Sequence, residues 1–85
     1  MEIITEVDGV TVPRVGSATL TVRMEIDGDA VISRTWVAAY APAGRGDVIP
    51  LFAGDDEHAA LMAFTGARLV LDSIERARGN RKADS

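Results

Sequence analysis

The chain has 85 residues, of which 47% are hydrophobic and 26% charged, and its formal net charge is −4. This length suits one small domain, and the composition is that of a globular protein and not of a disordered one. Without cysteine, neither a disulfide framework nor a thiolate zinc site is available. No apolar run reaches the ~18 residues of a membrane span, and the acidic start lacks the basic region of a signal peptide. We therefore expect a cytoplasmic protein that makes no membrane contact.

The charge is unevenly distributed. Residues 1–75 are strongly acidic, whereas the last ten residues are basic. An acidic body does not attract phosphate backbones, so we expect no direct binding of nucleic acid. We divide the chain into a single α+β domain over residues 1–80 and a flexible basic tail over residues 81–85.

The first predicted element is a β-hairpin over residues 3–12. Asp8-Gly9 is typical of a two-residue type I′ turn, in which both central positions take positive φ. Such a turn pairs residues on either side of it, and paired residues share a face. The hairpin therefore predicts one apolar side made of Ile3, Val7, Val10 and Val12.

Residues 18–27 form the clearest predicted strand, because apolar and polar residues alternate through it without an error. This period of two is typical of a strand with one buried and one solvated face. The apolar positions are Ala18, Leu20, Val22, Met24 and Ile26. Asp27-Gly28-Asp29 then turns the chain into a return strand over residues 30–41.

The register of the return strand has two solutions. A two-residue loop places Val31, Ser33, Thr35 and Val37 on the core side, and a three-residue loop places Ile32, Arg34, Trp36, Ala38 and Tyr40 there. We favour the second set, because burying Trp36 contributes more than burying two valines. In the first set, Trp36 and Tyr40 belong to an exposed stripe, which predicts a binding surface.

A loop over residues 42–47 precedes a short strand from Val48 to Ala53, which Pro50 marks as an edge strand. A helix is predicted from about Asp56 to Arg78, ended by Gly79-Asn80. The predicted fold class is α+β: an antiparallel β-sheet of four to five strands, made of two hairpins plus a short strand, with one C-terminal α-helix packed on one face.

The most chemical stretch is Gly54-Asp55-Asp56-Glu57-His58. Asp55 fits the N-cap of the helix, and Asp56 and Glu57 fit its first turn, where they face the positive end of the helix dipole. A metal site is disfavoured, because the chain has one histidine and consecutive helical side chains diverge by about 100°. We therefore expect no cofactor, no metal and no catalytic role for His58.

The helix carries a second apolar stripe, nearly opposite its core face. The predicted core face, which should pack on the sheet, comprises Ala60, Phe64, Ala67, Leu71, Ile74 and the stem of Arg78, and it is flanked by Leu61, Ala63 and Val70. Met62 and Leu69 lie nearly opposite this face, with Gly66 near them. A glycine inside a helix costs about 1 kcal/mol relative to alanine, and close approach of another backbone would explain it. We therefore predict a partner-binding surface. It combines this stripe with the acids at the start of the helix and the two aromatic residues of the return strand: Met62, Gly66, Leu69, Asp55, Asp56, Glu57, Trp36 and Tyr40.

These features favour a non-catalytic, small acidic protein-binding or inhibitor module. In size and charge the chain resembles the small accessory proteins of phages and mobile elements, including anti-CRISPR inhibitors. That resemblance implies a protein partner such as a nucleic-acid-binding effector complex. A homodimeric structural protein, in which the partner is a second copy of the chain, is the alternative, and a small enzyme subunit is a second one.

Overall fold

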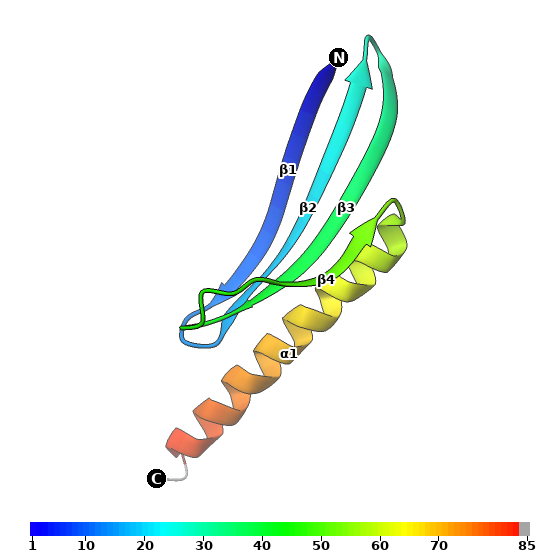
Figure 1. Ribbon diagram of the computed structural model, residues 1–85. Coiled ribbons are helices and arrows are strands. Elements are labelled where there is room, and N and C mark those ends of the chain that lie inside the picture. The colour runs from blue at the N-terminus through cyan, green and yellow to red at the C-terminus, as the bar shows by residue number, and fades with distance from the viewer. Residues whose placement is uncertain (84–85) are drawn as a thin grey trace.

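The computed structural model describes residues 1–83, with side-chain detail for residues 1–78. Four antiparallel strands form one open sheet in the order β1-β2-β3-β4, and a single C-terminal helix packs against it (Figure 1). The predicted α+β architecture is confirmed. The elements are β1 (Glu2–Val12), β2 (Gly16–Asp27), β3 (Ala30–Pro42), β4 (Ile49–Gly54) and α1 (Glu57–Ala83).

The predicted hairpin over residues 3–12 is wrong, because β1 is one continuous strand. Asp8 and Gly9 lie within it and pair with Leu20 and Thr19 of β2. A turn at Asp8-Gly9 would allow only a short hairpin, whereas the extended strand pairs with β2 along its whole length. The chain turns instead after Val12, whose carbonyl accepts a hydrogen bond from the Val15 N–H at 3.1 Å.

The loss of the hairpin changes which residues of β1 share a face. Alternate residues of one strand point to opposite sides. Val12 is buried and Val10 packs against the core, whereas Ile3 and Val7 are exposed on the other face. The single apolar side predicted for these four residues is therefore split between the two faces of the sheet.

The register of β3 combines parts of both predicted solutions. The turn has two residues, and Ile26 pairs with Val31. Glu25 then pairs with Ser33, so Ile32 is an extra residue in a β-bulge. A bulge reverses the facing of the residues that follow it. The favoured set from Arg34 to Tyr40 therefore lies on the face toward the helix, which we call the inner face. It does so although the turn has two residues and not the three that this set was predicted to need.

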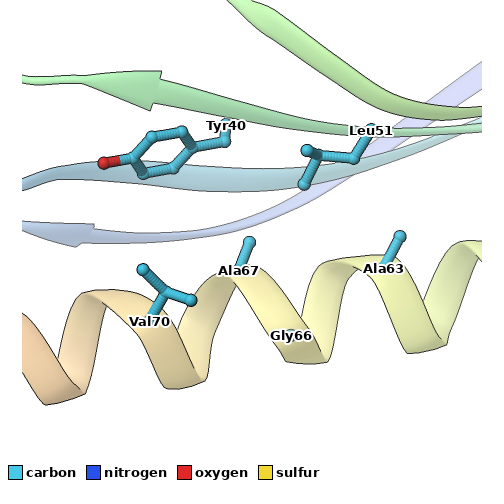
Figure 2. Close-up of a pocket in the computed structure, with 6 residues that line it drawn as sticks. All are labelled: Tyr40, Leu51, Ala63, Gly66, Ala67 and Val70. Atoms are coloured by element: carbon cyan, nitrogen blue, oxygen red, sulfur yellow. The ribbon is translucent and has the colours of Figure 1, made fainter.

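β4 is an edge strand, as the position of Pro50 predicts. A second bulge occurs here, because Ala38 pairs with Phe52 while Ala39 pairs with Pro50. Leu51 is the extra residue, and its side chain stays 44% exposed beside the helix. Figure 2 shows it above α1.

Helix α1 begins one residue later than predicted. Asp56 is the N-cap: its side-chain Oδ1 accepts from the Ala59 N–H and its carbonyl from the Ala60 N–H, both at 3.1 Å. Asp55, which was predicted as the cap, lies in a bend between β4 and the helix. Asp55 does not cap the helix, because the chain at that position is still in the bend that follows β4.

The predicted end of the helix is also wrong, since α1 continues past Gly79-Asn80 to Ala83. Glycine weakens a helix without stopping it, and the following arginine and lysine are good helix formers that also suit the negative end of the helix dipole. Of the basic tail predicted over residues 81–85, the first three residues are helical, and residues 84–85 lie outside the described part of the chain.

The core lies between the inner face of the sheet and one side of α1. Its helix residues are Ala60, Phe64, Ala67 and Leu71, which confirms the first four members of the predicted core face. Ile74 and Arg78, which were also predicted there, are exposed. Further along, the Arg78 guanidinium donates a hydrogen bond to the Arg14 carbonyl at 3.1 Å, which ties the helix to the β1–β2 turn. The buried residues of this core cluster are Val12, Val15, Ala18, Leu20, Ala38, Ala60, Phe64, Ala67 and Leu71.

The helix covers only part of the sheet. Strands β1 to β3 extend well past the start of α1, as Figure 1 shows. We call this extension, residues 1–8 and 21–36, the arm; Val22 is its one buried residue. The molecule measures 60 × 23 × 17 Å, and its radius of gyration is 16.1 Å, against about 12 Å for a compact domain of this length.

Candidate functional site

Part of the acidic stretch over residues 54–58 has a structural role at the start of the helix. Asp56 caps α1 and Glu57 is its first residue, while Asp55 and His58 are exposed. Within residues 1–83, no three histidine or acidic side chains come close enough together to hold a metal ion. The stretch therefore contributes a cap and negative charge at one end of the helix.

The predicted stripe on the helix is exposed. Met62 is 64% exposed and Leu69 59%, and a Cβ added at Gly66 would meet no atom within 4 Å. These residues continue into Val70, which is 52% exposed. Val70 lies on the flank of α1 toward β4, which we call the β4-side flank, whereas Met62 and Leu69 lie nearly opposite the core face.

An open apolar groove of about 440 Å³ runs between this flank and the sheet. Figure 2 shows its residues, with the two from the strands above the four from the helix. Gly66 widens the groove because it has no side chain to fill it. The lining residues are Tyr40, Leu51, Ala63, Gly66, Ala67 and Val70.

Leu51 and Val70 are members of this groove that sequence reasoning missed. Leu51 reaches it because of the β4 bulge, for which the interruption of the strand by Pro50 was the only available signal. Val70 was assigned to the margin of the core face. Its place at the groove follows from how far the helix is turned relative to β4, which the sequence does not reveal.

Trp36 and Tyr40 both lie on the inner face, half-buried against the core. Four residues along a strand separate them by about 13 Å, so they serve different surfaces. Tyr40 belongs to the groove. Trp36 belongs to the arm, where it pairs with Val22, which in turn pairs with Glu6 of β1.

Around Trp36 the inner face forms a shallow depression of about 210 Å³. Its lining combines apolar side chains with two exposed acidic residues, Glu6 and Asp8. Sequence reasoning missed these acids because it placed Asp8 in a turn. The lining residues are Glu6, Val7, Asp8, Leu20, Val22 and Trp36.

The arm is also the most acidic part of the molecule. It holds six carboxylates and two guanidinium groups, and one of the latter, Arg23, lies 3.8 Å from Glu25. The end of α1 carries the opposite charge in its arginines and lysine. The acids of the arm are Glu2, Glu6, Asp8, Glu25, Asp27 and Asp29.

The chain exposes an unusually large surface for its size. Its accessible area is 6006 Å², whereas a folded monomer of this mass exposes about 4,900 Å². The difference matches the molecule's shape, in which the arm extends past one end of α1.

Comparisons with protein-family models, with curated proteins and with solved structures found no match to this chain. Within residues 1–83, α1 is the only helix, and it lacks the apolar length needed to cross a membrane. The two candidate binding surfaces are the groove beside α1 and the depression at Trp36.

Proposed function

We propose that this protein is a non-catalytic protein-binding module of the inhibitor type, acting in the cytoplasm. Its partner presents a basic segment, and the arm binds that segment on its inner face. The observation that carries the proposal is the depression at Trp36, whose lining combines apolar residues with the acidic residues Glu6 and Asp8.

This combination suits an arginine or lysine side chain of another protein. The aliphatic stem of such a side chain packs on apolar surface while its charge stays in solvent. A cation near the face of a tryptophan ring gains a further attraction, and here the carboxylates of Glu6 and Asp8 supply the opposite charge. Trp36 and the two acids would thus act on one side chain together.

Clustered arginines and lysines are typical of proteins that bind nucleic acid, because phosphate contacts need them. We therefore propose a nucleic-acid-binding effector as the partner. A protein that occupies the phosphate-binding surface of such an effector inhibits it by competition. Small phage-encoded inhibitors, including those of the anti-CRISPR type, are the class of protein that this proposal describes.

The test uses the fluorescence of Trp36, the only tryptophan in the chain. The protein is titrated with a short peptide in which arginine alternates with glycine, and with the same peptide carrying glutamine in place of arginine. We expect the arginine peptide to change the emission with saturable binding, and Glu6→Gln/Asp8→Asn to weaken that binding at least tenfold.

The matched control is Asp72→Asn/Glu75→Gln, which removes the same charge from exposed helix positions. It should bind the arginine peptide as the wild type does. If both double variants lose affinity equally, the attraction comes from net charge and the depression is not the site. Affinity capture from cell extract with the wild type and the arm variant then identifies the partner, which should be retained by the wild type alone.

A further inference from the structure

The two edges of the sheet differ in how well they are protected from pairing with another chain. β4, at one edge, has six residues and is interrupted by Pro50 and a bulge. β1, at the other edge, runs for 11 residues and contains no proline, no lysine and no bulge. Prolines, lysines and bulges are the usual means by which a protein blocks an edge strand. β1 is therefore the edge that can accept a further strand.

The backbone groups of every second residue in β1 point away from β2, toward the open edge. Val12 points toward β2, because its carbonyl accepts from the Val15 N–H in the turn. This direction alternates along a strand, and the pairing with β2 has no register shift, so the odd-numbered residues point outward. Gly9 agrees, since its N–H donates to the Asp8 carboxylate at 2.9 Å. The outward residues in the arm are Ile3, Thr5 and Val7.

The side chains of β1 are sorted between the two faces of the sheet. The even-numbered positions face inward, as the burial of Val12 indicates, and all the acids of the strand are among them. The outer face carries Ile3 and Val7, which are 53% and 65% exposed. A strand added beside β1 would therefore meet carboxylates on one face and aliphatic side chains on the other. The acids are Glu2, Glu6 and Asp8.

These three acids have no counter-charge within the sheet. Within residues 1–78, none of them forms an ion pair, and the chain has no arginine or lysine before Arg14. Their neighbours in β2 are all apolar. The remaining side of each acid is the open edge, so a base on an added strand would be its cross-strand neighbour. The β2 neighbours are Ile26, Val22 and Leu20.

We propose that an extended segment of the partner protein pairs with residues 2–8 of β1 as a fifth, antiparallel strand. Every other strand pair in the sheet is antiparallel. In this segment arginine or lysine alternates with apolar residues. The bases lie beside the carboxylates on the inner face, and the apolar side chains pack on Ile3 and Val7 on the outer face. The inference rests on the proposed function, since it describes the conformation in which the basic segment binds.

The depression at Trp36 extends to this edge. It is lined by Trp36 of β3 and by Glu6, Val7 and Asp8 of β1. A base that lies opposite Glu6 or Asp8 on an added strand is therefore next to the lining of the same depression. One segment would use the backbone edge and the depression together, and its binding should change the emission of Trp36.

A second copy of the chain does not suit this edge. Antiparallel pairing of two β1 strands about a twofold axis keeps both inner faces on the same side of the joined sheet. The acids of one copy would then lie among those of the other, and like charges that face each other across strands repel. The charge of β1 thus favours a basic segment and opposes self-association.

The first test locates the hydrogen bonds of the segment. The protein is titrated with a short peptide in which arginine alternates with valine, and the fluorescence of Trp36 reports binding. Two further peptides carry N-methyl groups, one on every valine and the other on every arginine. The valines lie opposite the outward residues of β1, so their amides point at it, and methylating them should weaken binding at least tenfold. Methylated arginines are the matched control and should leave the affinity unchanged.

The second test changes β1. Thr5→Pro removes an outward N–H and no hydrogen bond to β2, so the fold should tolerate it while peptide affinity falls at least tenfold. Thr11→Pro is the matched control, because it removes an outward N–H beyond residues 2–8, and it should bind as the wild type does. Circular dichroism confirms that both variants fold. Amide hydrogen exchange of the wild type needs no substitution: the N–H groups of Thr5 and Val7 should exchange at least tenfold more slowly in the complex.

Three outcomes overturn the added strand: full affinity of the valine-methylated peptide, wild-type binding by a folded Thr5→Pro variant, and unchanged exchange at Thr5 and Val7. The proposed function fails on a different result, which is peptide binding that does not depend on Glu6 and Asp8. An arginine peptide that needs both acids but is indifferent to methylation would remove the strand and keep the function. The two can therefore fail separately.

Discussion

The same three strands, β1 to β3, run through the arm and through the part of the sheet that α1 covers, which we call the packed half. The two regions differ in burial. Apolar residues of β2 alternate with polar ones through both regions. Near the helix, Ala18 and Leu20 are buried, whereas Met24 and Ile26 in the arm are only half-buried. The alternation gives the sheet an apolar face, and this face becomes a core where α1 packs on it. Beyond α1 the same pattern leaves the apolar face only partly covered.

The stability of the domain should therefore reside in the packed half. Fully burying a leucine or phenylalanine contributes about 1.5–3 kcal/mol. Leu71 and Phe64 belong to this class, and both belong to the helix. Substitutions of similar kind in the two regions should have unequal effects, and three pairs of variants test this.

The largest difference is expected for Leu71→Ala compared with Ile26→Ala. Leu71 is fully buried, so its truncation should lower the free energy of unfolding by about 2–5 kcal/mol. Ile26 is half-buried in the arm, and its truncation should cost about 1 kcal/mol. Urea denaturation followed by circular dichroism measures both. Equal losses would show that the arm has a core of its own.

A smaller difference is expected between two glycines. Gly16 in the packed half has φ 153°, and a Cβ there would lie 2.6 Å from the Ala41 carbonyl oxygen. Gly16→Ala should therefore cost about 2 kcal/mol, because the backbone must shift. Gly28, at the tip of the arm, has φ 63° and open space around it.

Gly28→Ala should cost only about 1 kcal/mol, since a left-handed conformation is its only penalty. Thermal denaturation of the two variants gives the comparison. A greater loss at Gly28 than at Gly16 would mean that the tip of the arm is packed against something in solution, and the contrast between the two regions would be incorrect.

The smallest difference concerns the junction between the regions, where α1 begins. Asp56→Ala removes the N-cap and should cost about 1 kcal/mol. Asp55→Ala removes an adjacent carboxylate that makes no such bond, and should cost less than about 0.5 kcal/mol. Chemical denaturation resolves the two. A larger loss for Asp55→Ala would move the cap back to the residue predicted from the sequence.

The sequence predicts the fold well where one period dominates a long segment. The strand through residues 18–27 and the core face of the helix from Ala60 to Leu71 are correct, because each has several apolar positions in phase. The error in β1 arose because Asp8-Gly9 is a local turn signal, and a local signal loses to continuous pairing with β2.

The candidate surfaces were predictable only in part. The row of Met62 and Leu69 follows from helical geometry, and its exposure agrees with the prediction. The groove and the depression at Trp36 depend on two β-bulges, at Ile32 and Leu51, each of which adds one residue to a strand. A bulge changes the face of every later residue while leaving little trace in the sequence.

The order of elements along the chain has a consequence for synthesis. All four strands precede α1, so each strand can pair with the previous one as it leaves the ribosome. The apolar face of the sheet nevertheless remains uncovered until Phe64 and Leu71 have emerged. A paired sheet whose apolar face is still uncovered is prone to aggregate. Stalled or truncated chains that lack α1 should therefore depend on chaperones, although their strands are complete.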